Sequence, residues 1–506
     1  MLPAPHTTSA SVPSVGRVRL VVLATLIIAV ATAIRAYDIG RQSLWTDELF
    51  SRYYADLFGL KFLWTTGLLR ENSPPLYYMA IEGWMWLFGT SEAALRSLSL
   101  IASVLTLPLI YLIGCELFDR RRALLAMLVF ALSPLQIDFA QEARTYALLL
   151  IPIAVVLLAL ARLLRGDVGN RVLLTYAAGA IVALYCHATA IFFLVACNVI
   201  AIGCLLTERA FDRRVALTRW IVTNALVGVA ATPELVSFIA IGRTGSGIGW
   251  IPPFRPVDVI RALSPVIVGT STPTLFPGAE LSLLLAACLA GALLALRTPR
   301  RVWLVLVAVP AIFALLIAAA SLRNPIFIAR IFCWVGIPVS LLLADALASR
   351  WSWRTATIAI ATVVCVAGLG YQFAAPQKEP WRGLLAQLNL DLLHADHVVL
   401  GPLTDPTPLA YYAPELVGLQ KWQDRPRDNV EDGAIPVRMG VQWITRRQLV
   451  ADIRSGSNTW LIARTPDLPE VDALLAAVPR PAQRLERWCG KVVCIAALAW
   501  NTSKIE

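Results

Sequence analysis

Charged residues are scarce in this chain of 506 residues. Only 15% of the residues are charged and 58% are hydrophobic, whereas a soluble protein carries roughly 25% charged residues. The composition therefore argues against a soluble globular protein. Apolar runs of about 17 to 25 residues recur along most of the sequence, and each is long enough to cross the ~30 Å hydrocarbon core of a bilayer. The sequence thus predicts a polytopic α-helical membrane protein.

Motifs for metal binding and thiol redox chemistry are also missing. The sequence contains four histidines and no Cys-x-x-Cys or His-Glu-x-x-His pattern. His394 and His397 have a metal-like spacing, but they lack obvious acidic partners, and we interpret them as surface residues. Nine cysteines give no disulfide framework. Cys489 and Cys494 flank a predicted hairpin, and the sequence leaves open whether they form a disulfide.

The excess of basic residues does not indicate nucleic-acid binding. The formal net charge is +11, but the arginines cluster in short loops between apolar runs, which is the positive-inside pattern rather than a binding surface. We therefore expect membrane lipid as a partner and no nucleic acid. With the N-terminus in the cytoplasm, every arginine-rich loop falls on the cytoplasmic side, near residues 120–122, 162–171, 209–219, 297–301 and 350–354.

Hydropathy predicts about eleven transmembrane helices. They lie near residues 18–36, 95–115, 122–137, 145–162, 172–187, 188–206, 218–238, 280–296, 302–319, 328–348 and 354–372. Residues 1–372 therefore form a membrane domain. The segment from Ser73 to Gly89 is aromatic but too short to span, so we expect it to lie along the outer membrane surface.

The tail, residues 373–506, has more charge and no long apolar run. Segments 397–400 and 459–463 are typical of buried strands, and segments 384–393 and 471–478 are typical of helices. These features predict a small α/β domain on the extracytoplasmic side. For a bacterium, this orientation places the chain in the cytoplasmic (inner) membrane with a periplasmic tail.

Acidic residues on the outer face mark the candidate catalytic site. The sequence Trp45-Thr46-Asp47-Glu48 follows the first apolar run, and acidic groups next to a membrane are costly unless they serve a function. Asp47 is suited either to cap the helix that follows it or to remove a proton from an attacking hydroxyl group. One residue can do both.

A second polar cluster lies at the outer end of a later apolar run. It reads Gln141-Glu142-Ala143-Arg144-Thr145-Tyr146, and a local ion pair between Glu142 and Arg144 is the simpler alternative to a functional role. Arg330 opens another run on the outer face, where basic residues are disfavoured. It is suited to bind a lipid phosphate or to reach toward headgroups. His187 ends a further run, where a structural role is the simpler interpretation.

These residues, in this order, resemble the GT-C superfamily of integral-membrane glycosyltransferases. The similarity is greatest to the branch of protein O-mannosyltransferases and lipid A aminoarabinose transferases, and it covers about residues 18 to 372. The matching pieces are Ser43 to Glu48, Pro74-Pro75-Leu76-Tyr77-Tyr78, Ser91 to Arg96, Leu132-Ser133-Pro134, Gln141 to Tyr146, and Phe327 to Arg330.

The resemblance implies a GT-C fold and a sugar donor carried on polyprenyl phosphate. Asp47 would be the general base, and the attacking hydroxyl would displace the lipid phosphate with inversion. Glu48 and Glu142 would orient the acceptor or, together with Asp47, hold a divalent cation. Arg144 and Arg330 would bind the donor phosphate. Tyr77, Tyr146 and His187 would be acceptor-contacting or accessory residues.

One departure from the family pattern concerns the metal. Relatives often have histidine before the double proline, where this chain has Ser73, with Asn72 and Glu71 nearby. A divalent cation therefore stays an open possibility. The sugar stays open too, and the acceptor is a glycan, a lipid or a protein. The competing functions are a transporter or flippase for lipid-linked sugars and a structural subunit of an envelope assembly.

Overall fold

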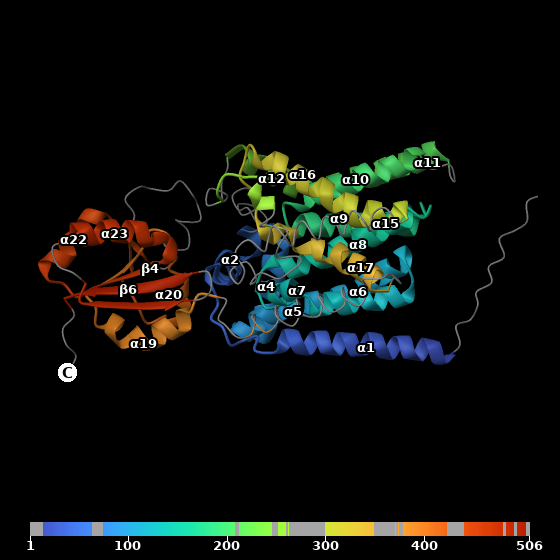
Figure 1. Cartoon of the computed structure of the whole chain (residues 1–506). Coiled ribbons are helices and arrows are strands. Elements are labelled where there is room, and N and C mark those ends of the chain that lie inside the picture. Colours follow the sequence, from blue (N-terminus) through green and yellow to red (C-terminus); the bar gives the residue numbers. More distant parts are fainter. Residues whose placement is uncertain are drawn as a thin grey trace, which may run out of the picture.

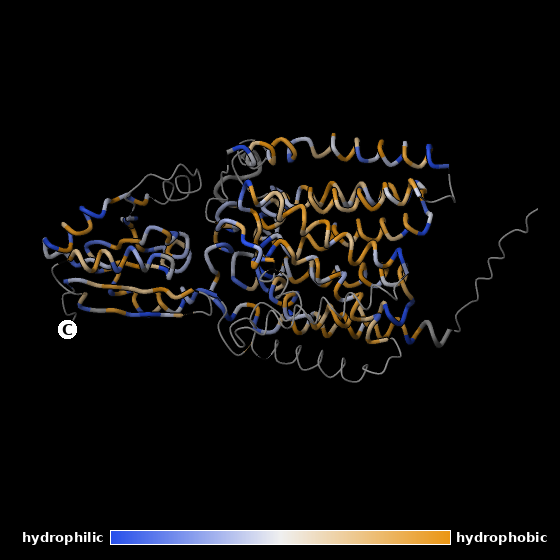
Figure 2. The backbone as a smooth tube through the Cα atoms, turned by 45° about the horizontal axis from the view of Figure 1, so that its top comes forward, coloured by the Kyte–Doolittle hydropathy of each residue, from blue (hydrophilic) through white to orange (hydrophobic). Residues whose placement is uncertain are grey.

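The fold comes from a computed structural model. It describes residues 14–62, 74–207, 212–244, 251–259, 262, 299–348, 370, 373, 378–422, 440–478, 482–489 and 493–501. These residues form a bundle of apolar helices and a separate α/β tail at one end of it (Figure 1). The middle parts of the helices are hydrophobic, and hydrophilic residues lie at the two ends of the bundle (Figure 2).

Six helices in the described residues are long and apolar enough to cross a membrane. They are α1 (Ser14–Ala36), α5 (Glu92–Leu117), α8 (Thr145–Leu163), α10 (Ala190–Thr207), the run Arg300–Ser321 (α15, η3 and α16) and the run Ala329–Ala348 (η4 and α17). All six were predicted. The predicted span 172–187 is α9 (Asn170–Cys186), which at 17 residues is shorter than the six. The predicted span 280–296 lies outside the described residues, as does 354–372 apart from residue 370.

Two predicted spans are broken helices, which raises the number of described spans to eight if each pair is one span. Segment 122–137 is α6 (Arg120–Leu132) followed by α7 (Pro134–Ala140), with a bend of 62°. Segment 218–238 is α11 (Arg213–Ala230) followed by α12 (Thr232–Thr244), with a bend of 69°. Pro134 and Pro233 lie at these breaks, because proline cannot donate the backbone hydrogen bond that would continue the helix.

Two further helices lie in the connection between α1 and α5, at the end of the bundle that faces the tail (Figure 1). They are α2 (Thr46–Phe62) and α4 (Leu76–Phe88). Helix α4 has only 13 residues, which is too short to cross a bilayer, as predicted for the surface segment. Trp84 on α4 donates from Nε1 to the carbonyl oxygen of Ala94 at 3.0 Å and so ties this helix to α5.

The tail contains a six-stranded sheet with the order β3-β2-β1-β4-β6-β5. Strands β1 to β4 are parallel, and β6 and β5 extend the sheet in antiparallel pairs. The described tail elements are α19 (Trp381–Leu393), β1 (His397–Leu400), α20 (Thr407–Tyr412), β2 (Gln420–Trp422), β3 (Gln442–Ile444), α22 (Arg446–Ser455), β4 (Thr459–Arg464), η5 (Thr465–Asp467), α23 (Leu468–Ala477), β5 (Arg484–Cys489) and β6 (Cys494–Trp500).

Helices cover both faces of this sheet. Alternating residues of β4 point to opposite faces: Trp460 and Ile462 pack with α19 and α20, whereas Leu461 and Ala463 pack with α22 and α23. The predicted strands 397–400 and 459–463 and the hairpin between β5 and β6 are confirmed. Cys489 and Cys494 face each other across that hairpin and form a disulfide.

Candidate functional site

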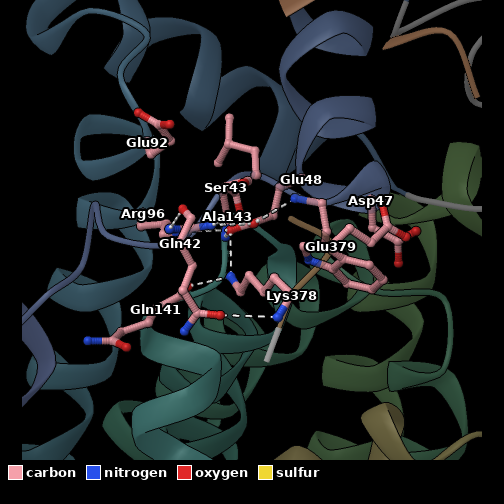
Figure 3. A network of polar contacts seen from close by, with 12 residues as sticks. Gln42, Ser43, Asp47, Glu48, Glu92, Arg96, Gln141, Ala143, Lys378 and Glu379 are labelled. Carbon is pink, nitrogen blue, oxygen red and sulfur yellow. Dashed lines mark hydrogen bonds and ion pairs between the residues drawn. The ribbon is translucent and has the colours of Figure 1, made fainter. Parts of the chain in front are cut away.

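The neighbouring acidic residues Asp47 and Glu48 have different environments. Both lie in the first turn of α2, where successive side chains diverge by about 100° around the helix axis. Glu48 is fully buried, at 0% exposure, whereas the Asp47 side chain is 32% exposed. Figure 3 shows Glu48 inside a polar network and Asp47 outside it. The helix therefore directs one carboxylate inward and leaves the other accessible.

Glu48 is held by charges from two distant parts of the chain. Arg96 of α5 donates to both Glu48 oxygens at 2.8 Å, and Lys378 donates to Oε1 at 3.0 Å. The backbone N–H of Ala143 adds a bond of 2.9 Å. Burial raises the pKa of Glu48, but Arg96 and Lys378 outweigh it and lower the pKa to about 2. Glu48 is therefore ionised and fully engaged.

Arg96 and Lys378 extend this network. The remaining donors of Arg96 reach three backbone carbonyl oxygens between α1 and α2, which belong to Ile39, Gln42 and Ser43. Lys378 also donates to the carbonyl oxygen of Gln141 at 2.7 Å. The network thus joins the start of α2, α5, the α7–α8 loop and Lys378 of the tail. This geometry is suited to a structural anchor.

Asp47 forms an ion pair with Arg330 of η4. The side chain of Arg330 is 31% exposed, and its guanidinium carbon lies 4.7 Å from the centre of the Trp45 ring, a distance typical of a cation–π contact. Burial raises the pKa of Asp47, but Arg330 and Arg144 lower it more strongly, so that the net shift is below the ordinary value. Asp47 is therefore ionised at neutral pH, as a base must be.

Arg144 does not pair with Glu142 among the described residues, contrary to the simpler interpretation of its sequence. Its Nη1 instead donates to the backbone oxygen of Asp47 at 3.3 Å and to Ser51 Oγ at 3.1 Å, and its Nε is buried without a hydrogen-bond partner. Arg144 thus reaches across from the start of α8 to α2. It leaves one buried donor free beside Asp47.

Glu142 is near the same cations but is not saturated by them. Its Oε1 atom is buried and has no hydrogen-bond partner. Burial raises the pKa of Glu142 to about 7, against the opposing effect of Lys378 and Arg330. A carboxyl group with such a pKa changes its protonation state near neutral pH and is able to donate a hydrogen bond when neutral.

The three predicted accessory residues lie around this group. Tyr77 is buried on α4, and its hydroxyl group interacts electrostatically with Arg144 and Glu142. Tyr146 is buried in the first turn of α8, with its ring centre 5.9 Å from that of His187. His187 caps the end of α9 and contacts Thr189 through Nδ1.

The part of the site that the structure describes does not form a site for a divalent cation. Among the described residues, no group of three or more histidine, cysteine, aspartate or glutamate side chains is placed to hold a metal. The carboxylate of Glu48 already forms ion pairs with Arg96 and Lys378, and that of Asp47 forms one with Arg330. Ser73 and its neighbours Asn72 and Glu71 lie outside the described residues.

Four charged residues at the site were not predicted from the sequence. Arg96 was part of a matching motif without a role, and Lys378 was not linked to the site. The same holds for Glu379, which accepts a bond from the Thr46 N–H next to Asp47, and for Arg464, which pairs with Glu379. A buried or paired charge cannot be recognised in a single sequence, because its partners are between 48 and 330 positions away. One local signal of a role for the start of the tail is its cluster of charged residues, Lys378-Glu379-Pro380-Trp381-Arg382.

One known family resembles part of this chain. A family model described as dolichyl-phosphate-mannose-protein mannosyltransferase matches residues 72–236, which is less than half of the chain. The matched range contains Glu142, Arg144 and His187 but neither Asp47 nor Arg330. A search of curated proteins finds no match.

Solved structures show the same fold over nearly the whole chain. The crystal structure of ArnT from Cupriavidus metallidurans in the apo state has a TM-score of 0.56 at 12% identity, covering 96% of this chain and 98% of that chain. The structure of that protein bound to undecaprenyl phosphate has a TM-score of 0.53 at 14% identity, covering 97% and 99%. The resemblance to the GT-C superfamily of membrane glycosyltransferases is confirmed.

Proposed function

We propose that this protein transfers a sugar from a polyprenyl-phosphate donor to an acceptor hydroxyl group at the outer face of the membrane. The proposal rests on one observation above all. Asp47 is a partly exposed, ionised carboxylate that lies between two arginines at the end of the helix bundle where the tail is attached. This combination of a base with cations suits displacement of a phosphate leaving group.

The reaction assigns each charge a task. Asp47 accepts the proton of the acceptor hydroxyl as its oxygen bonds to the anomeric carbon of the sugar. The bond between that carbon and the phosphate oxygen breaks, and polyprenyl phosphate leaves with one more negative charge than the bound phosphodiester carried. Arg330 and Arg144 stabilise this growing charge. A single displacement of this kind inverts the anomeric configuration.

The overall charge of the site supports an anionic ligand. Two arginines, Arg330 and Arg144, lie beside the single carboxylate of Asp47. Because the pKa of Glu142 is about 7, this carboxyl group is partly neutral at physiological pH. The two arginines therefore outnumber the fully ionised carboxylate beside them, which favours binding of a phosphate.

The fold supports the nature of the donor. ArnT from Cupriavidus metallidurans, which has the same fold, has been crystallised with undecaprenyl phosphate. The start of α1 and the tail lie at opposite ends of the bundle (Figure 1), which supports a cytoplasmic N-terminus and a periplasmic tail in a bacterial inner membrane. Within this proposal, Glu142 orients the acceptor, Glu48 anchors α2, and Tyr77, Tyr146 and His187 line the site.

Purified protein and a panel of radiolabelled polyprenyl-phosphate sugars test the proposal. We expect one donor class to support transfer to an envelope extract, and we expect the product to have the inverted anomeric configuration by NMR. The variant Asp47→Asn should still bind undecaprenyl phosphate but should turn over about 100- to 10,000-fold more slowly, because it lacks the base. Full turnover by Asp47→Asn would rule out this mechanism. Movement of the donor across vesicles without transfer would favour a flippase.

A further inference from the structure

We infer that the tail is part of the active site, because the ion pair between Glu379 and Arg464 positions Asp47 for proton transfer. This inference rests on the function proposed above and adds two positioning residues to it. Both belong to the tail, which the sequence alone presents as an accessory unit. Neither residue is assigned contact with the donor or the acceptor.

The contacts run from the tail's sheet to the start of α2. Arg464 is the last residue of β4, and its guanidinium pairs with Oε1 of Glu379. Oε2 of the same carboxylate accepts bonds from the backbone N–H of Thr46 at 3.2 Å and from Thr46 Oγ1 at 2.9 Å. Thr46 is the first residue of α2 and the covalent neighbour of Asp47.

Glu379 therefore acts as a helix cap supplied from another part of the chain. The first N–H groups of a helix have no partner within the helix, and a carboxylate at this end is further stabilised by the helix dipole. Glu379 is 2% exposed, and a buried carboxylate requires a paired cation. Arg464 supplies that cation. Without it, the carboxylate that fixes the first turn of α2 would be buried with less compensation.

The end of β4 is where such a residue is expected to act. Ligand and active sites in open α/β sheets lie at the carboxyl ends of the parallel strands, where neighbouring connections run in opposite directions. In this sheet, β1 has β2 on one side and β4 on the other. Arg464 ends β4 and contacts the carbonyl oxygen of Leu403, beyond β1, at 3.4 Å. It is close enough to Asp47 to lower the pKa of that residue.

The tail has separate contacts that hold it on the bundle. Arg382 pairs with Glu92 at 3.0 Å and also reaches the carbonyl oxygens of Gly40 and Arg41. The Tyr412 hydroxyl accepts a bond of 2.7 Å from the Leu44 N–H. Attachment of the tail thus does not depend on Arg464. This separation allows the positioning role to be tested apart from docking.

The test compares Arg464→Gln with Arg382→Gln in the full-length protein. A displacement of about 1 Å at a reacting group can cost about 100-fold in rate. We therefore expect Arg464→Gln to lower kcat by about 10- to 100-fold, with the donor KM within about twofold of wild type. The matched control Arg382→Gln removes a tail–bundle ion pair that does not reach Thr46. Its kcat should stay within about twofold of wild type.

A double-mutant cycle with Glu379→Gln distinguishes a positioning pair from two independent effects. If the two residues act as one unit, the double variant should lose no more kcat than Arg464→Gln alone, and Arg464→Lys should recover part of the rate. Binding of undecaprenyl phosphate, followed by tryptophan fluorescence, should be unchanged in all variants and shows that the bundle is folded.

Two outcomes overturn the inference. One is a wild-type kcat for Arg464→Gln in a preparation where Asp47→Asn is inactive, which refutes the positioning role and leaves the proposed function intact. The other is an equal loss of kcat in Arg464→Gln and Arg382→Gln, which attributes the effect to docking. Full activity of Asp47→Asn would refute the proposed function itself and, with it, this inference.

Discussion

Substitution of Glu48 by glutamine should destabilise the fold more than it impairs the chemistry. Glutamine keeps the size of the side chain and can still accept the N–H of Ala143, but it carries no charge. Arg96, whose side chain is 2% exposed, would then lose its only carboxylate partner among the described residues, and Lys378 would lose its ion pair. Removing one partner of a buried ion pair costs about 3–5 kcal/mol.

The natural control is Glu116→Gln at the opposite end of the bundle. Glu116 also pairs with two cations, Arg162 and Arg165, but its side chain is 22% exposed and theirs are 34% and 45% exposed. Exposed ion pairs contribute only about 0.2–1 kcal/mol. Thermal unfolding of the purified proteins in the same detergent should therefore show a much larger decrease in unfolding temperature for Glu48→Gln than for Glu116→Gln.

The pH dependence of stability offers a second measurement on the same residue. The pKa of Glu48 is lowered to about 2 in the folded protein, below the value of roughly 4.3 in an unfolded chain. Its stabilising contribution is therefore complete above pH ~4.3 and is lost as the pH falls toward 2. Glu48→Gln should lack this part of the acid transition. If Glu48→Gln unfolds at the wild-type temperature yet abolishes transfer, the anchor role is wrong and a catalytic role is indicated.

Two further predictions concern the donor phosphate. Arg330→Gln should weaken donor binding by about 10- to 100-fold, because a hydrogen bond to a charged group contributes about 1.5–3 kcal/mol. Stability should change little, because the ion pair between Arg330 and Asp47 is about one-third exposed. The control is Arg323→Gln, at an exposed arginine, and equal donor affinity in both variants would show that Arg330 does not bind the phosphate. The donor affinity of the wild-type protein should fall as the pH rises through about 7, because Glu142 then ionises and repels the phosphate. The donor affinity of Glu142→Gln should not depend on pH in this range. A wild-type pH profile in that variant would show that another group titrates.

The long apolar helices could be predicted from the sequence because hydropathy over about 20 residues depends on local composition alone. The two breaks could not be placed as readily. Pro134 and Pro233 lie inside continuous apolar runs, and proline is tolerated in some membrane helices when neighbours satisfy the freed backbone groups. Pro108 and Pro152, for example, lie within α5 and α8 without ending them.

The charged site was predictable in part for a similar reason. Asp47, Glu142, Arg144 and Arg330 stood out because each is an uncommon charge at the end of an apolar run, and the structure brings them together. Which carboxylate is accessible depends on contacts with distant segments. Lys378 reaches Glu48 across 330 positions, and no local pattern in a single sequence indicates such a partner.

The contrast between Asp47 and Glu48 explains how one helix turn can serve both structure and chemistry. A base must be accessible and must also be held in place, and these two demands conflict when one side chain has to meet both. Here Glu48 is buried, is paired with Arg96 and Lys378, and anchors the first turn of α2 to the bundle. Glu379 anchors the same turn to the tail. Asp47 is then free to remain exposed next to Arg330. On this argument the adjacent acidic residues are not interchangeable: Asp47→Glu should impair turnover with little effect on stability, whereas Glu48→Asp, which shortens the buried anchor, should lower the unfolding temperature.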